Sequence, residues 1–140
     1  PVNYSALVGE EAEKAEEAAN SVDAVLTNIE RLIAKKTNAL RDTDLEWSPE
    51  LAWRARMHSQ EMAGVGSLYH TNMGWENVLQ MPRDLDSLKP GEEDRMASLV
   101  VELWKASPPH CENMVCNVPQ RIGVGVAYND TDLYATQMFR

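Results

Sequence analysis

The sequence predicts one α+β domain in which helices precede an antiparallel sheet, and three observations support this prediction. The chain has 140 residues, which suits a single domain with a substantial core. Apolar residues recur at three- and four-residue spacing through most of the chain, and they alternate with a period of two only near its end. Apart from an acidic stretch near the N-terminus, there is no repeat or low-complexity tract. Helices followed by paired strands are typical of layered α+β domains.

The first part of the chain is expected to be helical. Residues 10–20 have the sequence EEAEKAEEAAN, which combines strong helix formers with no large side chain to bury. We therefore expect residues 1–20 to form an acidic helical extension and residues 21–140 to form the domain. The first helix of the domain is predicted to begin with Ser21 as its N-cap. The apolar face that follows at helical spacing comprises Val22, Val25, Leu26, Ile29, Leu32 and Ile33.

A second helix is predicted after a loop over residues 38–47. Ser48 suits the N-cap position and Pro49 the first helical position, because proline has no amide hydrogen to leave unpaired there. Gly64 or Gly66 is expected to end this helix. Leu51, Ala55 and Met62 would form its buried stripe.

The middle of the chain is expected to contain loops and one further long helix. Residues 66–90 have only short apolar pieces among Gly, Asn, Pro and Asp, which predicts loops with room for one short helix. A third helix is predicted over about residues 91–106, since acidic residues favour its N-terminal end. Pro108 and Pro109 are expected to end it. Its apolar stripe comprises Met96, Leu99, Val100, Leu103 and Trp104.

The last segment has the pattern of a β-hairpin. Ile122, Val124, Val126 and Tyr128 alternate with small residues, and a turn-forming stretch over residues 129–132 leads into a second run of β-formers ending at Phe139. The alternating small residues include Gly123 and Gly125, which would allow a helix to approach the sheet closely.

The charge and apolar content argue against nucleic acid and membrane partners. The chain has 13 basic and 22 acidic residues and a net charge of -9, which repels phosphate and anionic lipid. The longest apolar stretch, residues 96–104, is far shorter than the roughly 20 residues of a membrane span. The chain begins with Pro1 rather than methionine, which is expected of a processed N-terminus.

The two cysteines, Cys111 and Cys116, allow two interpretations. They are too few for a thiolate zinc site and lack CxxC spacing. The four residues between them would close a small loop, and such a pair suits a disulfide in an oxidising compartment. The alternative is two reduced, half-buried thiols.

Histidine is the most informative residue type here, because imidazole both binds metals and titrates near neutral pH, and the chain has three. His58 lies within the second predicted helix beside polar residues, so we expect it on the helix surface. His70 and His110 each follow a predicted helix, and Glu76 comes six residues after His70. Two loops held by one scaffold can converge on a cleft, although exposed loop histidines would give the same spacing.

The methionines and tryptophans at helical or helix-flanking positions are expected to be scaffold. Core packing explains them without a cofactor. They are Met57, Met62, Met96, Trp47, Trp53 and Trp104.

From about Ile29 to Phe139, the chain resembles the CAP superfamily, also called the SCP-like or cysteine-rich secretory protein, antigen 5 and pathogenesis-related 1 domain, in its short bacterial form. The resemblance rests on the order of several elements and not on one motif. They are two helices over residues 32–41 and 51–64, His70 followed by Gly74-Trp75-Glu76-Asn77, Trp104 followed by Ser107-Pro108 and His110, and the closing segments Ile122-Gly123-Val124-Gly125 and Tyr134-Ala135-Thr136-Gln137-Met138-Phe139.

The resemblance implies a three-layer α-β-α sandwich with a central antiparallel sheet and a cleft lined by His70, Glu76 and His110. A second acidic residue of the family does not carry over, because Ser107 stands at its position. Glu102 lies five residues away from Ser107, roughly 140° around a helix, and is expected to point elsewhere. Trp75 is an insertion relative to the family's Gly-Glu-Asn pattern.

Three functions follow as expectations. By resemblance, the chain would be a secreted module whose cleft binds a small apolar molecule, a sterol or lipid, or a divalent metal; zinc suits two imidazoles of His70 and His110 with Glu76 and water. The alternative is that the protein is an enzyme, a hydrolase in which Glu76 acts as the base. Ser107 is not expected to attack a substrate, because two prolines separate it from His110. The third is a structural or interaction module whose acidic extension joins a partner.

Overall fold

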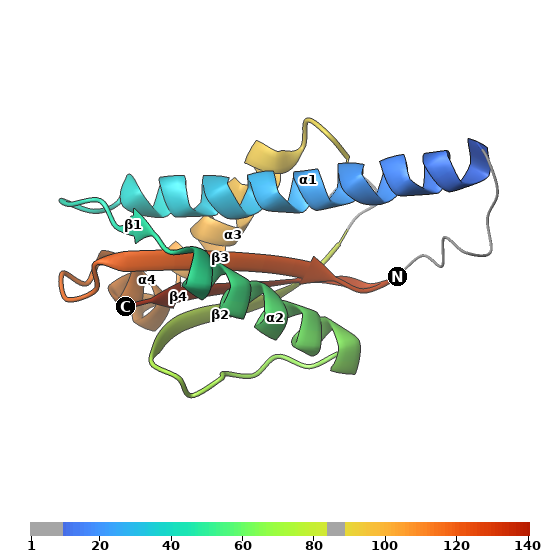
Figure 1. The fold of residues 1–140 in the computed structure, drawn as a ribbon. Helices are drawn as coiled ribbons and strands as arrows, with labels where there is room; N and C mark the ends of the chain where they lie inside the picture. The colour runs from blue at the N-terminus through green and yellow to red at the C-terminus, as the bar shows by residue number, and fades with distance from the viewer. Residues whose placement is uncertain (1–9, 84–88) are drawn as a thin grey trace.

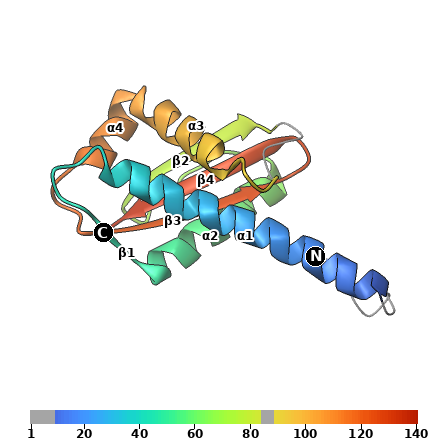
Figure 2. The same ribbon diagram turned by 90° about the horizontal axis from the view of Figure 1, so that it is seen from above.

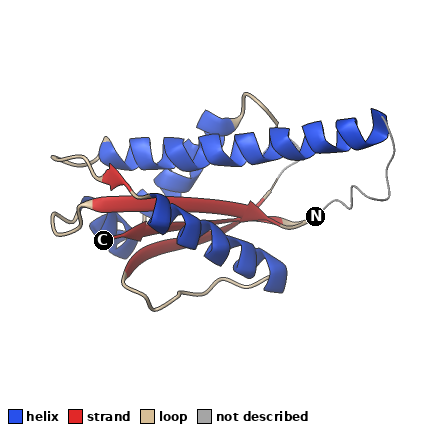
Figure 3. Cartoon of the chain, in the orientation of Figure 1, coloured by secondary structure: helices blue, strands red, loops and turns tan. Residues whose placement is uncertain are grey.

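A four-stranded sheet lies between two helical layers (Figures 1 and 3). The structure is a computed structural model that describes residues 10–83 and 89–140. The strands are β1 (Glu46–Trp47), β2 (Trp75–Pro82), β3 (Arg121–Tyr128) and β4 (Asp132–Phe139), in the order β1-β3-β4-β2. The helices are α1 (Glu10–Asn38), α2 (Pro49–Val65), α3 (Glu93–Lys105) and α4 (Pro108–Val115). Helices α1, α3 and α4 cover one face and α2 covers the other, so the predicted α-β-α sandwich is confirmed.

The sheet is antiparallel except at one end. Strands β3 and β4 form the predicted hairpin, with Val126 opposite Ala135. β2 pairs with the other side of β4, and the two residues of β1 run parallel to β3. The core on the α1 and α3 side contains the alternating residues Ile122, Val124 and Val126 of β3, as the period of two predicts.

Local capping signals place the ends of α2 as expected. The Ser48 hydroxyl accepts a hydrogen bond from the Leu51 amide at 3.2 Å, and Pro49 occupies the first helical position. At the other end Gly66 has a φ of 71°, and its amide donates to the Met62 carbonyl at 2.8 Å. Both are standard ways to satisfy the unpaired groups at helix ends.

Helix α1 does not begin at Ser21. It runs without a break from Glu10 to Asn38, and Figure 2 shows its N-terminal part extending past the sheet. The acidic, alanine-rich stretch has a high helix propensity, so the helix anchored by Val25, Ile29 and Ile33 continues toward the N-terminus. Residues 1–9 of the predicted extension lie outside the described residues.

The expectation of loops throughout residues 66–90 was wrong, because this stretch contains β2. The strand has no alternating pattern because both of its faces are covered: four consecutive residues, 76–79, are buried. Two of them, Glu76 and Asn77, are polar, which further hides the strand from a hydropathy pattern.

Pro108 and Pro109 follow the end of α3, as expected, and they also begin α4. α3 ends at Lys105, and the two prolines occupy the first turn of α4, where proline is tolerated. Cys111 and Cys116 are half-buried free thiols, so the predicted disulfide was wrong and the alternative of two thiols holds. The reason is the helical turn between them, since five positions place side chains roughly 140° apart around the axis.

Helix α2 lies directly on the backbone of β3. A Cβ atom on Gly123 would lie 2.1 Å from the Ala52 nitrogen, and one on Gly125 would lie 1.9 Å from the Arg56 nitrogen. No side chain therefore fits between helix and strand at these two positions, which confirms the predicted role of the glycines.

At each side of the sheet, one outward-facing backbone group is bonded by a side chain. At the β3 edge, the buried Glu30 carboxylate of α1 accepts from the Val126 amide at 2.9 Å and from two nitrogens of Arg56 at 2.7 and 2.8 Å. Glu30 thereby raises the pKa of the Arg56 guanidinium and links α1 to α2 around the edge. At the β2 edge, the indole of Trp104 donates to the Val78 carbonyl at 3.2 Å.

In the parts of the chain described here, we find no helix of the length and apolarity that crossing a membrane requires.

Gly125→Ala is expected to lower the free energy of unfolding by about 3 kcal/mol or more, because the added methyl group meets helix backbone that cannot move aside. Urea unfolding followed by circular dichroism measures this. Gly64→Ala in α2 is the control: nothing lies within 4 Å of its Cβ position, and alanine should stabilise the helix by about 0.5–1 kcal/mol. Equal effects from the two variants would contradict the close approach of α2 to β3.

Candidate functional site

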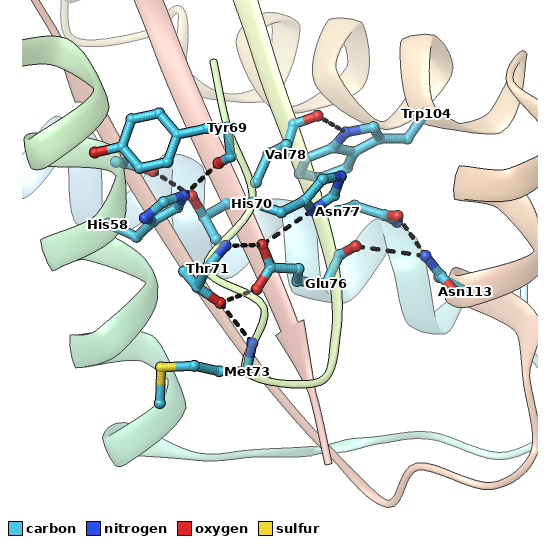
Figure 4. A network of polar contacts seen from close by, with 12 residues as sticks. His58, Tyr69, His70, Thr71, Met73, Glu76, Asn77, Val78, Trp104 and Asn113 are labelled. Atoms are coloured by element: carbon cyan, nitrogen blue, oxygen red, sulfur yellow. Dashed lines mark hydrogen bonds and ion pairs between the residues drawn. The ribbon is translucent and has the colours of Figure 1, made fainter. Parts of the chain in front are cut away.

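His70 and Glu76 form a direct pair at the end of β2 (Figure 4). The His70 side chain is 53% exposed, whereas that of Glu76 is 3% exposed. One Glu76 oxygen lies 3.0 Å from Nδ1 of His70 and 2.8 Å from the amide of Thr71, and the other accepts from the Thr71 hydroxyl. The buried carboxylate is thus fully engaged with one short segment of the preceding loop.

This pairing defines which nitrogen of His70 faces outward. An ionised carboxylate only accepts hydrogen bonds, so Nδ1 of His70 carries a hydrogen, and Nε2 is the nitrogen that faces away from Glu76. Within the described residues, Nε2 of His70 has no hydrogen-bond partner. Both oxygens of Glu76 already accept hydrogen bonds from His70 and Thr71, and the hydrolase alternative, in which Glu76 is the base, stays a prediction.

His110 lies in the first turn of α4 and not in a loop. Its Nδ1 is 2.8 Å from the hydroxyl of Ser107, the N-cap residue. The two prolines thus leave Ser107 and His110 in hydrogen-bond contact, and the expectation that Ser107 does not attack a substrate stays a prediction. Pro109 has no amide hydrogen for the serine to cap, which leaves the hydroxyl free to bond the imidazole instead.

His110 shares an environment with His70. Burial, and next the charge of the nearby His70 ring, lower the pKa of His110 below its usual value. A ring with a lowered pKa is neutral at pH 7, which leaves one of its nitrogens with a lone pair. Of the residues that the sequence singled out, His70 contacts Glu76 and His110 contacts Ser107, and His70 lies near enough to His110 to affect its pKa.

A chain of buried amides holds α4 against the sheet. Asn77 of β2 donates to the His110 carbonyl at 3.0 Å and to the side-chain oxygen of Gln137 at 2.9 Å. Gln137 in turn donates to the Thr37 hydroxyl at 2.8 Å, and Asn113 of α4 donates to Asn77 at 3.0 Å. Because successive residues of a strand face opposite sides, Glu76 holds His70 on one face of β2 while Asn77 holds the His110 helix on the other.

The expectation that His58 lies on a helix surface was wrong. Its side chain faces inward at 7% exposure, and Nε2 lies 2.6 Å from the carbonyl oxygen of Tyr69. The signal was present in the sequence, since His58 falls at helical spacing between the buried residues Ala55 and Met62.

An open groove of about 600 Å³ lies between α2 and the loop that carries His70. Its lining includes Trp53, Met57 and Met73, which are 65%, 48% and 58% exposed, together with His70 and Thr71. Trp53 and Met57 are therefore not scaffold, contrary to expectation. The other four residues assigned to scaffold pack inside or partly inside the core: Trp47, Met62, Met96 and Trp104.

The zinc site expected from the sequence has the imidazoles of His70 and His110 as its ligands, together with Glu76 and water. Within residues 10–83 and 89–140, no group of three or more His, Cys, Asp and Glu side chains is placed to hold a metal ion. Glu76 orients His70 instead of adding a third ligand, an arrangement common behind metal-binding histidines. Glu102 is exposed on α3.

The sequence from residue 25 to residue 139 matches the model of the CAP family, described as the cysteine-rich secretory protein family. The chain belongs to the CAP family. The match covers all elements of the domain except the N-terminal part of α1, and it includes His70, Glu76 and His110. No curated protein matches the sequence.

Solved structures show the same fold at low identity. An extracellular protein containing an SCP domain from Bacillus anthracis strain Ames has a TM-score of 0.58 and 15% identity; the match covers 96% of this chain and 45% of that protein. This CAP chain thus spans less than half of its length. An outer surface protein from Borrelia burgdorferi has a TM-score of 0.52 and 15% identity over 86% of this chain and 92% of that one. MpPR-1i has a TM-score of 0.51 and 16% identity, with 84% and 87% covered.

Glu76→Gln is expected to lower the free energy of unfolding by about 1–3 kcal/mol, because an amide nitrogen cannot accept the hydrogen bonds that the buried carboxylate accepts from His70 and Thr71. Urea unfolding at neutral pH measures the loss. Glu102→Gln on the exposed surface of α3 is the matched control and should change stability by less than about 0.5 kcal/mol. A Glu76→Gln variant as stable as the control would show that the pair does not hold the loop.

Proposed function

We propose that this CAP domain is a secreted binding module whose groove beside His70 takes a small apolar molecule. The observation that carries the proposal is the groove of about 600 Å³ with exposed Trp53, Met57 and Met73 on its walls. Ligand sites typically have volumes of about 300–1,000 Å³ and combine apolar walls with a few polar groups. The polar groups of the lining include the imidazole of His70 and the side chain of Thr71, and Arg54, Gln60 and Glu61 add charged and amide groups from α2.

The side chains of the groove suit a flexible or irregular apolar ligand. Methionine adapts its shape to what it contacts, and exposed tryptophan supplies a large apolar face. Exposed apolar side chains gathered in one hollow are more typical of a binding surface than of a bare surface. A sterol or a fatty acid meets these requirements, and its single polar end would face His70.

A location outside the cell is part of the proposal. Two proteins that share the fold are described as an extracellular protein and an outer surface protein. The structure has Cys111 and Cys116 as free thiols, and neither a location outside the cell nor the fold requires them to pair.

Trp53→Ala is expected to weaken ligand binding about tenfold, which is about 1.4 kcal/mol, because the indole forms an exposed apolar wall of the groove. The measurement is titration of the domain with two fluorescent probes, cis-parinaric acid for fatty acids and dehydroergosterol for sterols. Leu99→Ala is the control, since Leu99 is a similarly exposed apolar residue on α3 that does not line the groove. If neither probe binds, or if both variants lose affinity equally, the groove is not the site.

A divalent metal held by His70 and His110 is a second candidate. The His70 charge contributes to the lowered pKa of His110, and Nδ1 of each ring is already bonded to Glu76 or Ser107. The two Nε2 atoms are the groups that would hold the ion, with water completing the coordination. When bound, zinc would supply a site for an anionic ligand group.

Calorimetric titration with zinc should give measurable heat with the wild type and none with the double variant His70→Ala, His110→Ala, because that variant lacks both proposed imidazole ligands. His58→Gln, which leaves both proposed ligands in place, should keep the binding heat. Equal heats from the wild type and the double variant would exclude this metal site.

A further inference from the structure

Three consecutive residues of the loop before β2 are each held by a side chain from a rigid element (Figure 4). The Tyr69 carbonyl accepts from His58 of α2 at 2.6 Å. His70 and the Thr71 amide both donate to Glu76 of β2, at 3.0 and 2.8 Å. The segment is therefore fixed from α2 on one side and from β2 on the other.

We propose that His58 is a positioning residue for His70: by fixing the Tyr69 carbonyl to α2, it sets where the His70 ring meets Glu76 and the groove. His58 itself is buried at 7% exposure and bonds the residue directly before His70. The inference rests on the proposed role of His70 in the ligand site, although its first test below requires no ligand.

The chemistry of the contact supports a specific role. A carbonyl oxygen only accepts, so Nε2 of His58 carries the hydrogen and the ring acts as a donor. The rings of His58 and Tyr69 also pack edge to face, with centroids 5.0 Å apart. An apolar residue would fill this buried position without the cost of removing an imidazole from water, so the hydrogen bond is what the histidine adds.

Helix α2 gives this donor a fixed position. The next residue, Ser59, donates to the carbonyl of Gly125 at 2.8 Å and lies 2.8 Å from the hydroxyl of Thr136. Gly125 is also where the helix backbone touches β3. Because α2 is fixed on the sheet, the hydrogen bond from His58 to the Tyr69 carbonyl also fixes the position of the loop.

The loop needs such an anchor because its path is irregular. Asn72 has a φ of 64°, in the left-handed region that a side chain with a Cβ rarely adopts. With the chain turning sharply there, Glu76 alone holds only the two residues before the turn. The His58 bond adds a third fixed point, which restricts rotation of the segment about the His70–Glu76 contact.

The test uses the whole domain without ligand and compares His58→Leu, which lacks the donor, with His58→Gln, whose amide can donate to the same carbonyl. Long-range ¹H–¹⁵N correlation spectra, recorded where the imidazoles are neutral, report the tautomer of His70. The wild type and His58→Gln should show mainly the Nδ1–H form. In His58→Leu the fraction of that form should fall at least twofold, and affinity for the probe that binds the wild type should fall about tenfold.

Ser59→Ala separates positioning from general destabilisation. It removes two buried hydrogen bonds from the neighbouring residue of α2, so it should lower the melting temperature yet leave the His70 tautomer unchanged. If His58→Leu does not fold, His58→Asn replaces it, since its amide is too short to reach the carbonyl. Two results would overturn the inference. One is a His70 tautomer that is the same in the donor-free variant as in the wild type. The other is a Ser59→Ala variant whose His70 tautomer changes as much as that of the donor-free variant. Failure of every probe and of zinc to bind the wild type would refute the proposed function and leave the tautomer result to stand on its own.

Discussion

The arrangement of this CAP domain depends on the direct contact between the backbone of α2 and the two glycines of β3. Where a strand presents side chains, a helix rests above a layer of them; here Gly123 and Gly125 let α2 lie on the strand itself. The contact fixes both the depth and the angle of the helix. Everything that α2 carries takes its position from this contact: the groove wall formed by Trp53 and Met57 on its outer side, and His58 on its inner side.

The second determinant is β2, which gathers the two histidines from different parts of the chain. Its neighbouring residues Glu76 and Asn77 face opposite sides of the sheet, and each holds one histidine-bearing segment. The result is an exposed imidazole, His70, supported by a buried carboxylate, and a partly buried one, His110, supported by a hydroxyl and a helix. Rigid support beneath exposed functional groups is what keeps a binding site in shape without its ligand.

The sequence predicted those parts of the fold whose signals are local. The caps of α2 at Ser48 and Gly66 depend on a few adjacent residues, and the β3–β4 hairpin shows its alternation directly. Strand β2 escaped prediction because helices cover both of its faces, which removes the alternation that marks a half-exposed strand.

Within the site, the sequence identified His70, Glu76 and His110 but not how they are supported. Spacing places His58 on the buried stripe of α2, yet polar neighbours favoured the surface; only the tertiary contact with Tyr69 explains a buried histidine. Trp53 and Met57 were assigned to the core because large apolar residues usually lie there, and composition cannot reveal which of them line a groove. The Ser107–His110 bond depends on two prolines that both end one helix and begin the next.

The bonding of the sheet edges by side chains bears on how copies of this protein behave in concentrated solution. A strand at the edge of a sheet offers unpaired amides and carbonyls on which another chain can add a strand, the first step of many aggregation reactions. Here Glu30 occupies the Val126 amide on one edge, and Trp104 occupies the Val78 carbonyl on the other. Two helices thus supply, from their side chains, the partners that a foreign strand would otherwise provide. The domain can expose apolar side chains in its groove while these backbone positions remain closed to self-assembly.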